Sequence, residues 1–209
     1  MFVPLNQIFY SEHQLSLDHD KILSEVMMAK IKDDVPGDEI NYSSYPISHT
    51  FFKDSNIYPE TADKVFNAIL DQLSIIFDAD DLWVIDENEI WGHIVEPGQQ
   101  TIVHNHVCGA VKEISLSFAY YPNHPSDSGE IVFQTQINTN VYEASVQPRK
   151  GLAIIFDASM FHYTPINNSK YTRVSVSGNL LATEKMIKLL DEDVNCSSPY
   201  WKYSGKTNI

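Results

Sequence analysis

The chain has 209 residues, of which 43% are hydrophobic and 20% are charged, as in a globular domain and unlike a disordered protein. Its 14 Lys and Arg residues against 28 Asp and Glu residues give a formal net charge of -14 at pH 7. Because such a field repels phosphate and anionic lipid, we expect neither a nucleic acid nor a membrane as its partner. A small molecule, a peptide or a protein side chain is the expected substrate class.

Cysteine content and the start of the chain bear on the expected compartment. Cys108 and Cys196 are too few for a disulfide framework, which favours a reducing environment. The first residues carry no basic and apolar secretory pattern, and no apolar run approaches the roughly 20 residues of a membrane-spanning helix. We therefore expect a cytoplasmic location.

Two segments within the first 80 residues have helical periodicity. Apolar residues between His19 and Ile31 follow helical spacing, with Asp18 or Asp20 available as a cap. A second and cleaner apolar stripe runs from Glu60 to Phe77, and Pro59 stands where a first-turn proline belongs. Residues 32–58 are expected to form loops or short edge strands. Both helices need an apolar partner surface, most simply the face of a sheet.

After residue 80 the chain changes to short runs rich in Val, Ile, Phe, Tyr and Thr, separated by turn residues. The expected strands are 82–86, 90–96, 100–106, 112–121, 130–136, 141–147, 152–157 and 171–180. This pattern predicts a mainly β fold with flanking helices, namely a double-stranded β-helix (jelly roll) core with the N-terminal helices packed outside. We expect one domain over 1–209, with helical support over 1–80, the jelly-roll core over 81–182, and a short helix and tail over 183–209.

Two histidines stand one residue apart in Val103-His104-Asn105-His106. Alternate side chains of a strand share a face, so His104 and His106 would project together, and neutral imidazole is a common metal ligand. The alternative is that one ring is exposed while the other is a hydrogen-bonded core histidine.

Two further residues extend this pattern. His162 follows the buried strand led by Gly151 and could supply a third ligand from across the barrel, or it could simply bond a backbone carbonyl. Arg173 alternates with Val174 on the last strand, so its guanidinium would point inward, where it needs an anion. That anion could be the carboxylate of a ligand, bound at two points with help from Ser175, or an Asp or Glu of the chain itself.

Over residues 88–180 the sequence resembles the iron(II)- and 2-oxoglutarate-dependent oxygenases, most closely the small group common in marine bacteria and their phages. The resemblance rests on the order and spacing of several short pieces, each of low specificity alone. They are Trp91, Glu96-Pro97-Gly98, His104-Asn105-His106, Ser117-Phe118-Ala119-Tyr120-Tyr121, Gly151 leading into His162, and Arg173-Val174-Ser175-Val176-Ser177-Gly178-Asn179.

The resemblance implies a metal held by His104, His106 and His162, and a distal carboxylate of 2-oxoglutarate bound by Arg173 and Ser175. Tyr121 would donate a hydrogen bond to the cosubstrate. The wider superfamily has a carboxylate at the position of His106, and an imidazole there raises the net charge of the site by one unit. No catalytic residue beyond the metal ligands is implied.

The remaining candidates favour structural roles. Cys108 shares the parity of the histidine pair and could complete a zinc site, although Gly109 is expected to end the strand first. His124 is expected to be exposed in a turn, and Trp83 and Trp91 to pack in the core. The acidic run 78–81 is expected to solvate a helix end, with cation binding as the alternative.

The function that these features favour is an iron(II)- and 2-oxoglutarate-dependent dioxygenase, in the cytoplasm of the host if a phage encodes it. Two alternatives remain open on the sequence. One is a cupin-like metal-binding or structural protein without oxygenase activity, and the other is a three-histidine dioxygenase that needs no cosubstrate.

Overall fold

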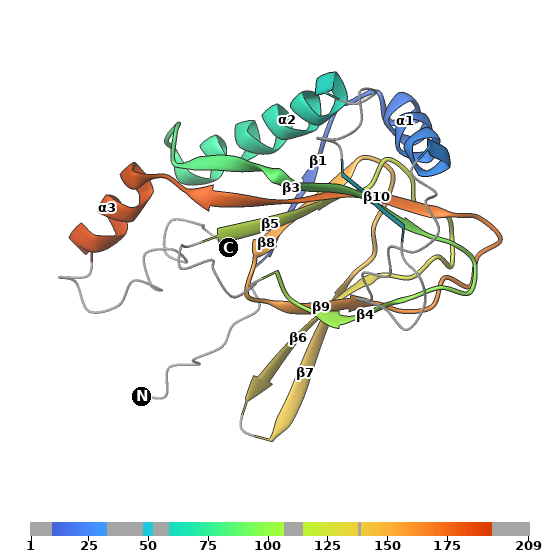
Figure 1. The fold of residues 1–209 in the computed structure, drawn as a ribbon. Helices are drawn as coiled ribbons and strands as arrows, with labels where there is room; N and C mark the ends of the chain where they lie inside the picture. Colours follow the sequence, from blue (N-terminus) through green and yellow to red (C-terminus); the bar gives the residue numbers. More distant parts are fainter. Residues whose placement is uncertain (1–9, 33–47, 52–58, 107–114, 138, 194–209) are drawn as a thin grey trace.

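The computed structural model describes residues 10–32, 48–51, 59–106, 115–137 and 139–193, and two β-sheets that face each other form its centre (Figure 1). The larger sheet has six strands in the order β1-β8-β5-β10-β3-β2. Their bounds are Tyr10–Gln14 (β1), Leu152–Asp157 (β8), Ser115–Tyr120 (β5), Arg173–Ala182 (β10), Trp83–Val95 (β3) and Ser48–Phe51 (β2).

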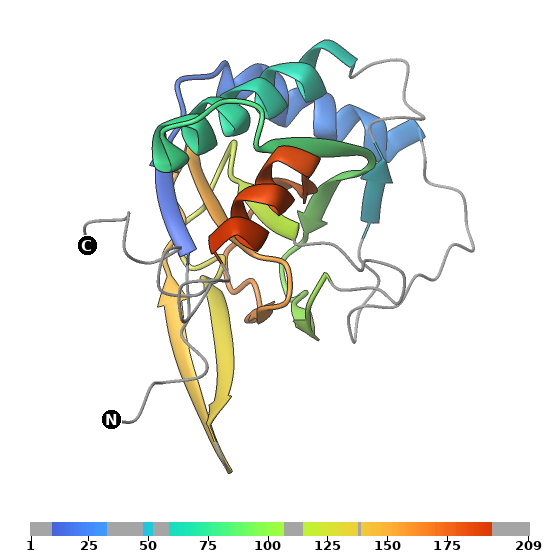
Figure 2. The ribbon, with the colours of Figure 1, turned by 90° about the vertical axis from the view of Figure 1, so that its left-hand side faces the viewer.

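The smaller sheet has four strands in the order β4-β9-β6-β7. They span Thr101–His104 (β4), Phe161–Thr164 (β9), Ile131–Ile137 (β6) and Asn140–Val146 (β7). Every strand pair in both sheets is antiparallel. The hairpin of β6 and β7 extends beyond the body of the molecule in both views (Figures 1 and 2).

Helices α1 (His19–Lys32) and α2 (Pro59–Phe77) cover the outer face of the larger sheet, and α3 (Glu184–Asp193) follows β10 (Figures 1 and 2). This arrangement confirms the predicted fold class. Asp18, rather than Asp20, caps α1, since its carboxylate accepts a hydrogen bond from the backbone N–H of Lys21 at 3.1 Å. No helix in the described part of the chain is long and apolar enough to cross a bilayer.

The apolar stripe of α2 is buried as predicted. Val65, Ile69 and Leu73 are at most 2% exposed and belong to a cluster that fills the space between the two helices and the larger sheet. A second cluster lies between the two sheets and consists of Ala119, Tyr121, Ile131, Phe133, Val146, Leu152, Ile154 and Phe156. The larger sheet is therefore covered on both faces.

Several strand predictions need correction. The strands expected at 82–86 and 90–96 form one strand, β3, because the turn residues between them are absorbed as a bulge against β10 between Gly178 and Leu180. The strand expected at 100–106 ends at His104, after an irregularity in its pairing with β9. The strand expected at 112–121 is described only from Ser115, as β5.

Some elements carried too little local signal to be predicted. Strand β1, which pairs with β8, and the four-residue strand β9 were not among the predicted strands. Their pairing partners lie far away in the sequence, and short strands depend on such partners more than on local preference. Strand β2 falls within the region where edge strands were expected, and it does lie at an edge of the larger sheet.

Gly151, at the start of β8, is required by the packing of the N-terminal elements. Its φ of 86° lies in the left-handed region. A Cβ atom there would meet the side chains of Gln14 and His19, at 2.2 and 2.8 Å. The glycine therefore lets β1 and α1 approach the sheet closely.

Candidate metal centre

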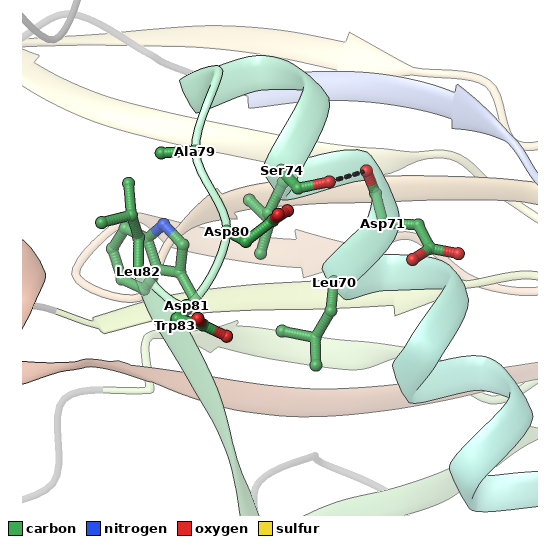
Figure 3. A pocket seen from close by; sticks show the side chains of 9 residues that line it. Leu70, Asp71, Ser74, Ala79, Asp80, Asp81, Leu82 and Trp83 are labelled. Atoms are coloured by element: carbon green, nitrogen blue, oxygen red, sulfur yellow. Dashed lines mark hydrogen bonds between the residues drawn. The ribbon is translucent and has the colours of Figure 1, made fainter.

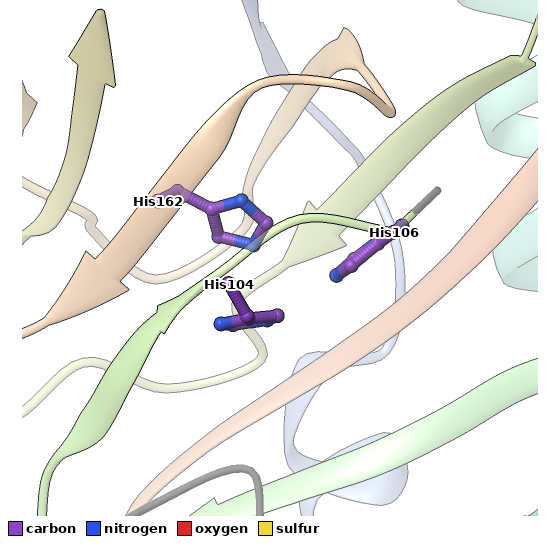
Figure 4. A group of neighbouring side chains, drawn as sticks. All are labelled: His104, His106 and His162. Carbon is purple, nitrogen blue, oxygen red and sulfur yellow. The ribbon is translucent and has the colours of Figure 1, made fainter. Parts of the chain in front are cut away.

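Three histidines meet inside the fold, on the inner side of the smaller sheet (Figure 4). His104 ends β4 and lies directly opposite His162 of β9 in the strand register, while His106 follows β4. One ring nitrogen from each residue lies within 4.8 Å of the others. The centroids of the His104 and His162 rings are 4.3 Å apart, and those of His106 and His162 are 4.9 Å apart.

This convergence was predicted, but by an argument that was only partly right. His106 does not share a strand with His104, because β4 has already ended. Its backbone N–H instead donates a hydrogen bond to the carbonyl of Ala158 at 2.9 Å, which holds this residue beside the chain that leads into β9. His106 is therefore positioned by a backbone hydrogen bond to a residue distant in the sequence, and not by the alternation of side chains along a strand.

A hydrogen bond at Nδ1 orients each of the three rings. Nδ1–H of His104 donates to the carbonyl of Ile102, and Nδ1–H of His162 donates to that of Met160, both at 2.9 Å. Nδ1 of His106 lies 3.0 Å from the amide oxygen of Asn179. With Nδ1 as the donor in each ring, the tautomer places the lone pair on Nε2, the arrangement that metal-bound imidazole requires.

Burial favours the uncharged form of His104 and His162. Removal from water lowers the pKa of His104, and it lowers the pKa of His162 well below its ordinary value, with the neighbouring His104 and His106 adding to the effect. Neutral rings can offer lone pairs at physiological pH. The donor set therefore fits a first-row divalent metal ion such as iron or zinc, and it is the only such group in the described residues.

Aromatic side chains surround this cluster. Phe156 packs its ring against His162 at a centroid distance of 4.9 Å, and Phe133 packs against Phe156 at 5.1 Å. Trp91, half-buried on β3, meets His106 edge-on at 5.3 Å. These apolar walls lower the local dielectric and strengthen electrostatic interactions at the cluster.

Arg173 lies at the start of β10 and is 2% exposed. Its Nη1 donates to the carbonyls of Ser128 and Gly129 at 3.2 and 3.4 Å. No carboxylate in the described residues forms a salt bridge with it, although a chain Asp or Glu was one of the two expected partners. A buried guanidinium held only by carbonyls retains donors for an anionic ligand.

Ser175 and Tyr121 are also buried, at 4% exposed each. Ser175 is two residues from Arg173 on β10, so both share one face of the strand. Burial raises the pKa of Tyr121 to about 12 against the opposing effect of Arg173, so its hydroxyl keeps its proton and can donate it to an acceptor. Arg173 and Ser175 thus share one face of β10, and the effect of Arg173 on the pKa of Tyr121 shows that Tyr121 lies near the guanidinium.

The loop from Pro122 to Gly129 differs from expectation. His124 was expected to be exposed, but it is half-buried, and its Nε2 donates to the carbonyl of Gly129 at 2.8 Å. The same carbonyl accepts from Arg173. The sequence suggested an open turn because Pro and Asn surround His124, whereas contact with the arginine end of β10 decides its burial.

Sequence reasoning assigned no role to Asn179 or to the Ser117 hydroxyl, both of which contact His106. Ser117 Oγ lies 2.8 Å from Nδ1 of His106 and donates to the amide oxygen of Asn179 at 2.7 Å. The signal that could have found them is the polar alternation of β10, where Arg173, Ser175 and Asn179 share one face.

The remaining predictions concern residues on the helix side of the larger sheet and residues outside the described parts of the chain. Cys108 and Gly109 lie outside them. Trp83 packs in the helix-side core as expected, at 5% exposed. Beside it a hollow of about 350 Å³ lies where α2 meets β3, lined by Leu70, Asp71, Leu73, Ser74, Ala79, Asp80, Asp81, Leu82 and Trp83 (Figure 3). The aspartates of the acidic run are exposed and are not part of the metal-ligand group identified in the described residues.

Neither the known protein-family models nor the curated proteins contain a match to this sequence. Solved structures do match its fold. A Pseudomonas putida prolyl-4-hydroxylase is 15% identical with a TM-score of 0.57, covering 84% of this chain and 94% of its own. The non-heme alpha-ketoglutarate-dependent carbocyclase SnoK from nogalamycin biosynthesis is 12% identical with a TM-score of 0.64, covering 84% and 80%.

A prolyl hydroxylase from Trichoplax adhaerens, in complex with a peptide fragment of the hypoxia-inducible factor oxygen degradation domain, is 11% identical with a TM-score of 0.62. The match covers 86% of each chain. Identities this low establish a shared fold. That fold is the one implied by the resemblance in the sequence.

Proposed function

We propose that this protein is an iron(II)- and 2-oxoglutarate-dependent dioxygenase that hydroxylates its substrate. The observation that carries the proposal is the meeting of three imidazoles within the described jelly roll, which also holds a buried arginine without a carboxylate partner among the described residues. The fold is shared with a non-heme alpha-ketoglutarate-dependent enzyme and with two prolyl hydroxylases.

Each predicted residue has a role in this proposal. Nε2 atoms of His104, His106 and His162 hold iron(II), since their Nδ1 atoms are engaged in hydrogen bonds. Arg173 and Ser175 bind the distal carboxylate of 2-oxoglutarate, and the protonated Tyr121 donates a hydrogen bond to the cosubstrate. When bound, iron and 2-oxoglutarate together supply the oxygen activation, coupled to loss of carbon dioxide, that hydroxylates an unreactive carbon.

The protein's own contribution is binding, orientation and exclusion of water. Backbone carbonyls fix the rings of His104 and His162, and the carbonyls of Ser128 and Gly129 fix the guanidinium of Arg173. Phe156 and Phe133 keep bulk water from the metal ligands. No side chain has to donate or remove a proton, so these residues act by holding geometry.

The finer parts of the proposal concern substrate, family group and location. We place the chain in the marine bacterial and phage group on the spacing of His104, His106, His162 and Arg173. The negative charge favours a small molecule, a peptide or a protein side chain over nucleic acid. The cytoplasm, that of the host for a phage protein, is the proposed location.

The test is succinate release from 2-oxoglutarate by the purified protein with iron(II) and oxygen. Arg173→Met removes the guanidinium, and the loss of charge-assisted hydrogen bonds should raise KM for 2-oxoglutarate roughly 10- to 100-fold without weakening metal binding. The matched control is Arg149→Met, which changes the chain's other arginine, on the surface, and should leave KM unchanged.

Two results would contradict the proposal and select an alternative. Tight metal binding without turnover under any condition indicates a cupin-like metal-binding or structural protein. Oxygen consumption that 2-oxoglutarate does not affect indicates a three-histidine dioxygenase that needs no cosubstrate.

A further inference from the structure

His106 is oriented differently from the other two ligands. His104 and His162 each donate to a backbone carbonyl two residues earlier in the chain. His106 instead contacts side chains of two other strands, Ser117 of β5 and Asn179 of β10. A backbone carbonyl is present whatever the side chain, whereas these two contacts depend on the identity of residues 117 and 179.

Ser117 and Asn179 form hydrogen bonds with each other and with the His106 ring. They are directly opposed in the register of β5 and β10, and they are 0% and 6% exposed. The amide oxygen of Asn179 accepts from Ser117 Oγ at 2.7 Å and from Nδ1–H of His106 at 3.0 Å. One buried oxygen thus receives two donors, which fixes the ring plane as well as the tautomer.

The sheet is irregular at this position. The register between β10 and β3 shifts between Gly178 and Leu180, so the bulge lies beside Asn179. Bulges next to functional sites commonly redirect a side chain. On the other side of β10 the pairing with β5 continues without interruption through Asn179, so the Ser117 contact is kept where the β3 register shifts.

The amide at position 179 also sets the charge of the site. A carboxylate that accepts from a metal-bound imidazole makes that ring more basic and more anionic in character. An amide oxygen accepts the same hydrogen bond without adding charge. With Asn179, this hydrogen bond therefore adds no negative charge beside the three imidazoles.

We propose that Asn179, supported by Ser117, is the positioning residue for His106: it accepts the Nδ1–H hydrogen bond and so holds Nε2 toward the metal. The inference rests on the proposed function only in taking the three histidines as metal ligands. Neither residue contacts the metal or the substrate in this proposal.

The experiment measures metal binding by the full chain without any substrate. Cobalt(II), whose visible spectrum reports ligand geometry, and iron(II) are titrated into wild type, Asn179→Leu, Asn179→Asp and Ser117→Ala. Ser177→Ala is the matched control, because Ser177 is a buried serine of β10 with no recorded bond to an imidazole. Thermal melting of each metal-free variant separates loss of binding from loss of folding.

Asn179→Leu should weaken metal binding roughly 10- to 100-fold and alter the cobalt spectrum, as loss of an outer partner typically does. Ser117→Ala should weaken it less, because the Asn179 contact remains. Asn179→Asp should restore affinity to at least the wild-type value, with a spectrum shifted by the more basic ring. A purely structural role for Asn179 would not give this rescue.

Wild-type affinity and spectrum in Asn179→Leu would overturn the inference. If Asn179→Leu does not fold, then Asn179→Asp and Ser117→Ala decide, and an unchanged spectrum in both overturns it. A wild type that binds metal through this network but never converts 2-oxoglutarate would refute the proposed function and leave the inference standing. A wild type that turns over normally with an unaffected Asn179→Leu would do the opposite.

Discussion

On β10, Val174, Val176 and Leu180 face the helices and belong to the apolar cluster beneath them, whereas Arg173 and Asn179 face the smaller sheet and bind polar groups. Both sets are almost fully buried. Burial of the first set stabilises the fold through the hydrophobic effect, about 25 cal/mol for each Å² of apolar surface. Burial of the second set is unfavourable unless each polar atom finds a partner.

The contrast between these two faces indicates which part of the fold can bind ligands. The helix-side face has one task, which is to hold α1 and α2 against the sheet. The inner face carries polar groups whose burial costs stability, among them three imidazoles and a guanidinium that forms no salt bridge in the described residues. Changes on the two faces should therefore separate stability from ligand binding.

The largest expected effect is on the inner face. His162→Ala removes one of the three proposed metal ligands, a side chain that is 6% exposed. Metal affinity and turnover should fall by more than about 100-fold, the upper end of what loss of an outer partner costs. Calorimetric metal titration checks this, and the metal-free melting temperature should not fall. Retained affinity would remove His162 from the ligand set.

A large-to-small substitution on the helix-side face should lower stability and leave metal affinity unchanged. Phe118 is fully buried on β5 and packs edge-on against Phe66 of α2. Phe118→Ala should lower the free energy of unfolding by about 3 to 5 kcal/mol through the cavity it leaves. Denaturant unfolding measures this loss, while metal affinity of the folded protein should stay within about two-fold. A weakened metal site would show that the two faces are coupled.

A substitution where the N-terminal elements contact the larger sheet should have an effect of intermediate size on stability. Gly151→Ala introduces a Cβ into a left-handed position that Gln14 and His19 already fill. We expect a loss of about 1 to 3 kcal/mol in unfolding free energy, the usual size of such backbone strain. Denaturant unfolding measures it, with Gly98→Ala as the control, since that glycine has a similar φ but nothing within 4 Å. Equal losses in both would assign the effect to φ alone.

The smallest effect, on metal affinity, should come from replacing one proposed ligand with a side chain of another ligand type. His106→Asp restores the carboxylate of the wider superfamily, and its negative charge should hold metal affinity within about ten-fold of wild type. His106→Ala provides no ligand and should weaken binding further. Equal affinity in the Asp and Ala variants would count against position 106 as a ligand. Competition with a metal indicator measures both.

Much of this protein could be predicted from local pattern. The stripe of Val65, Ile69 and Leu73 identified α2, and the alternation of Arg173 and Val174 identified the two faces of β10. The three histidines were found from their spacing and from the resemblance to a family. These signals lie within short segments, where periodicity of the side chains suffices.

Local sequence pattern could not predict the features that depend on contacts between distant parts of the chain. β1 and β9 are strands because β8, β4 and β6 pair with them, and His124 is buried because the Arg173 end of β10 packs beside it. Asn179 contacts His106 across 73 positions, through a hydrogen bond with no local signature.

Periodicity within short segments was enough to predict the layered β fold. Residue type, spacing and the family resemblance were enough to single out the three histidines as candidate metal ligands. The orientation of His106 depends on the tertiary structure, because the acceptor of its Nδ1–H group is Asn179, 73 positions away on β10. The tertiary structure also left Arg173 without a carboxylate partner among the described residues despite 28 acidic residues in the chain. Which charges meet depends on distance in space, and that distance is set by the packing of the two sheets.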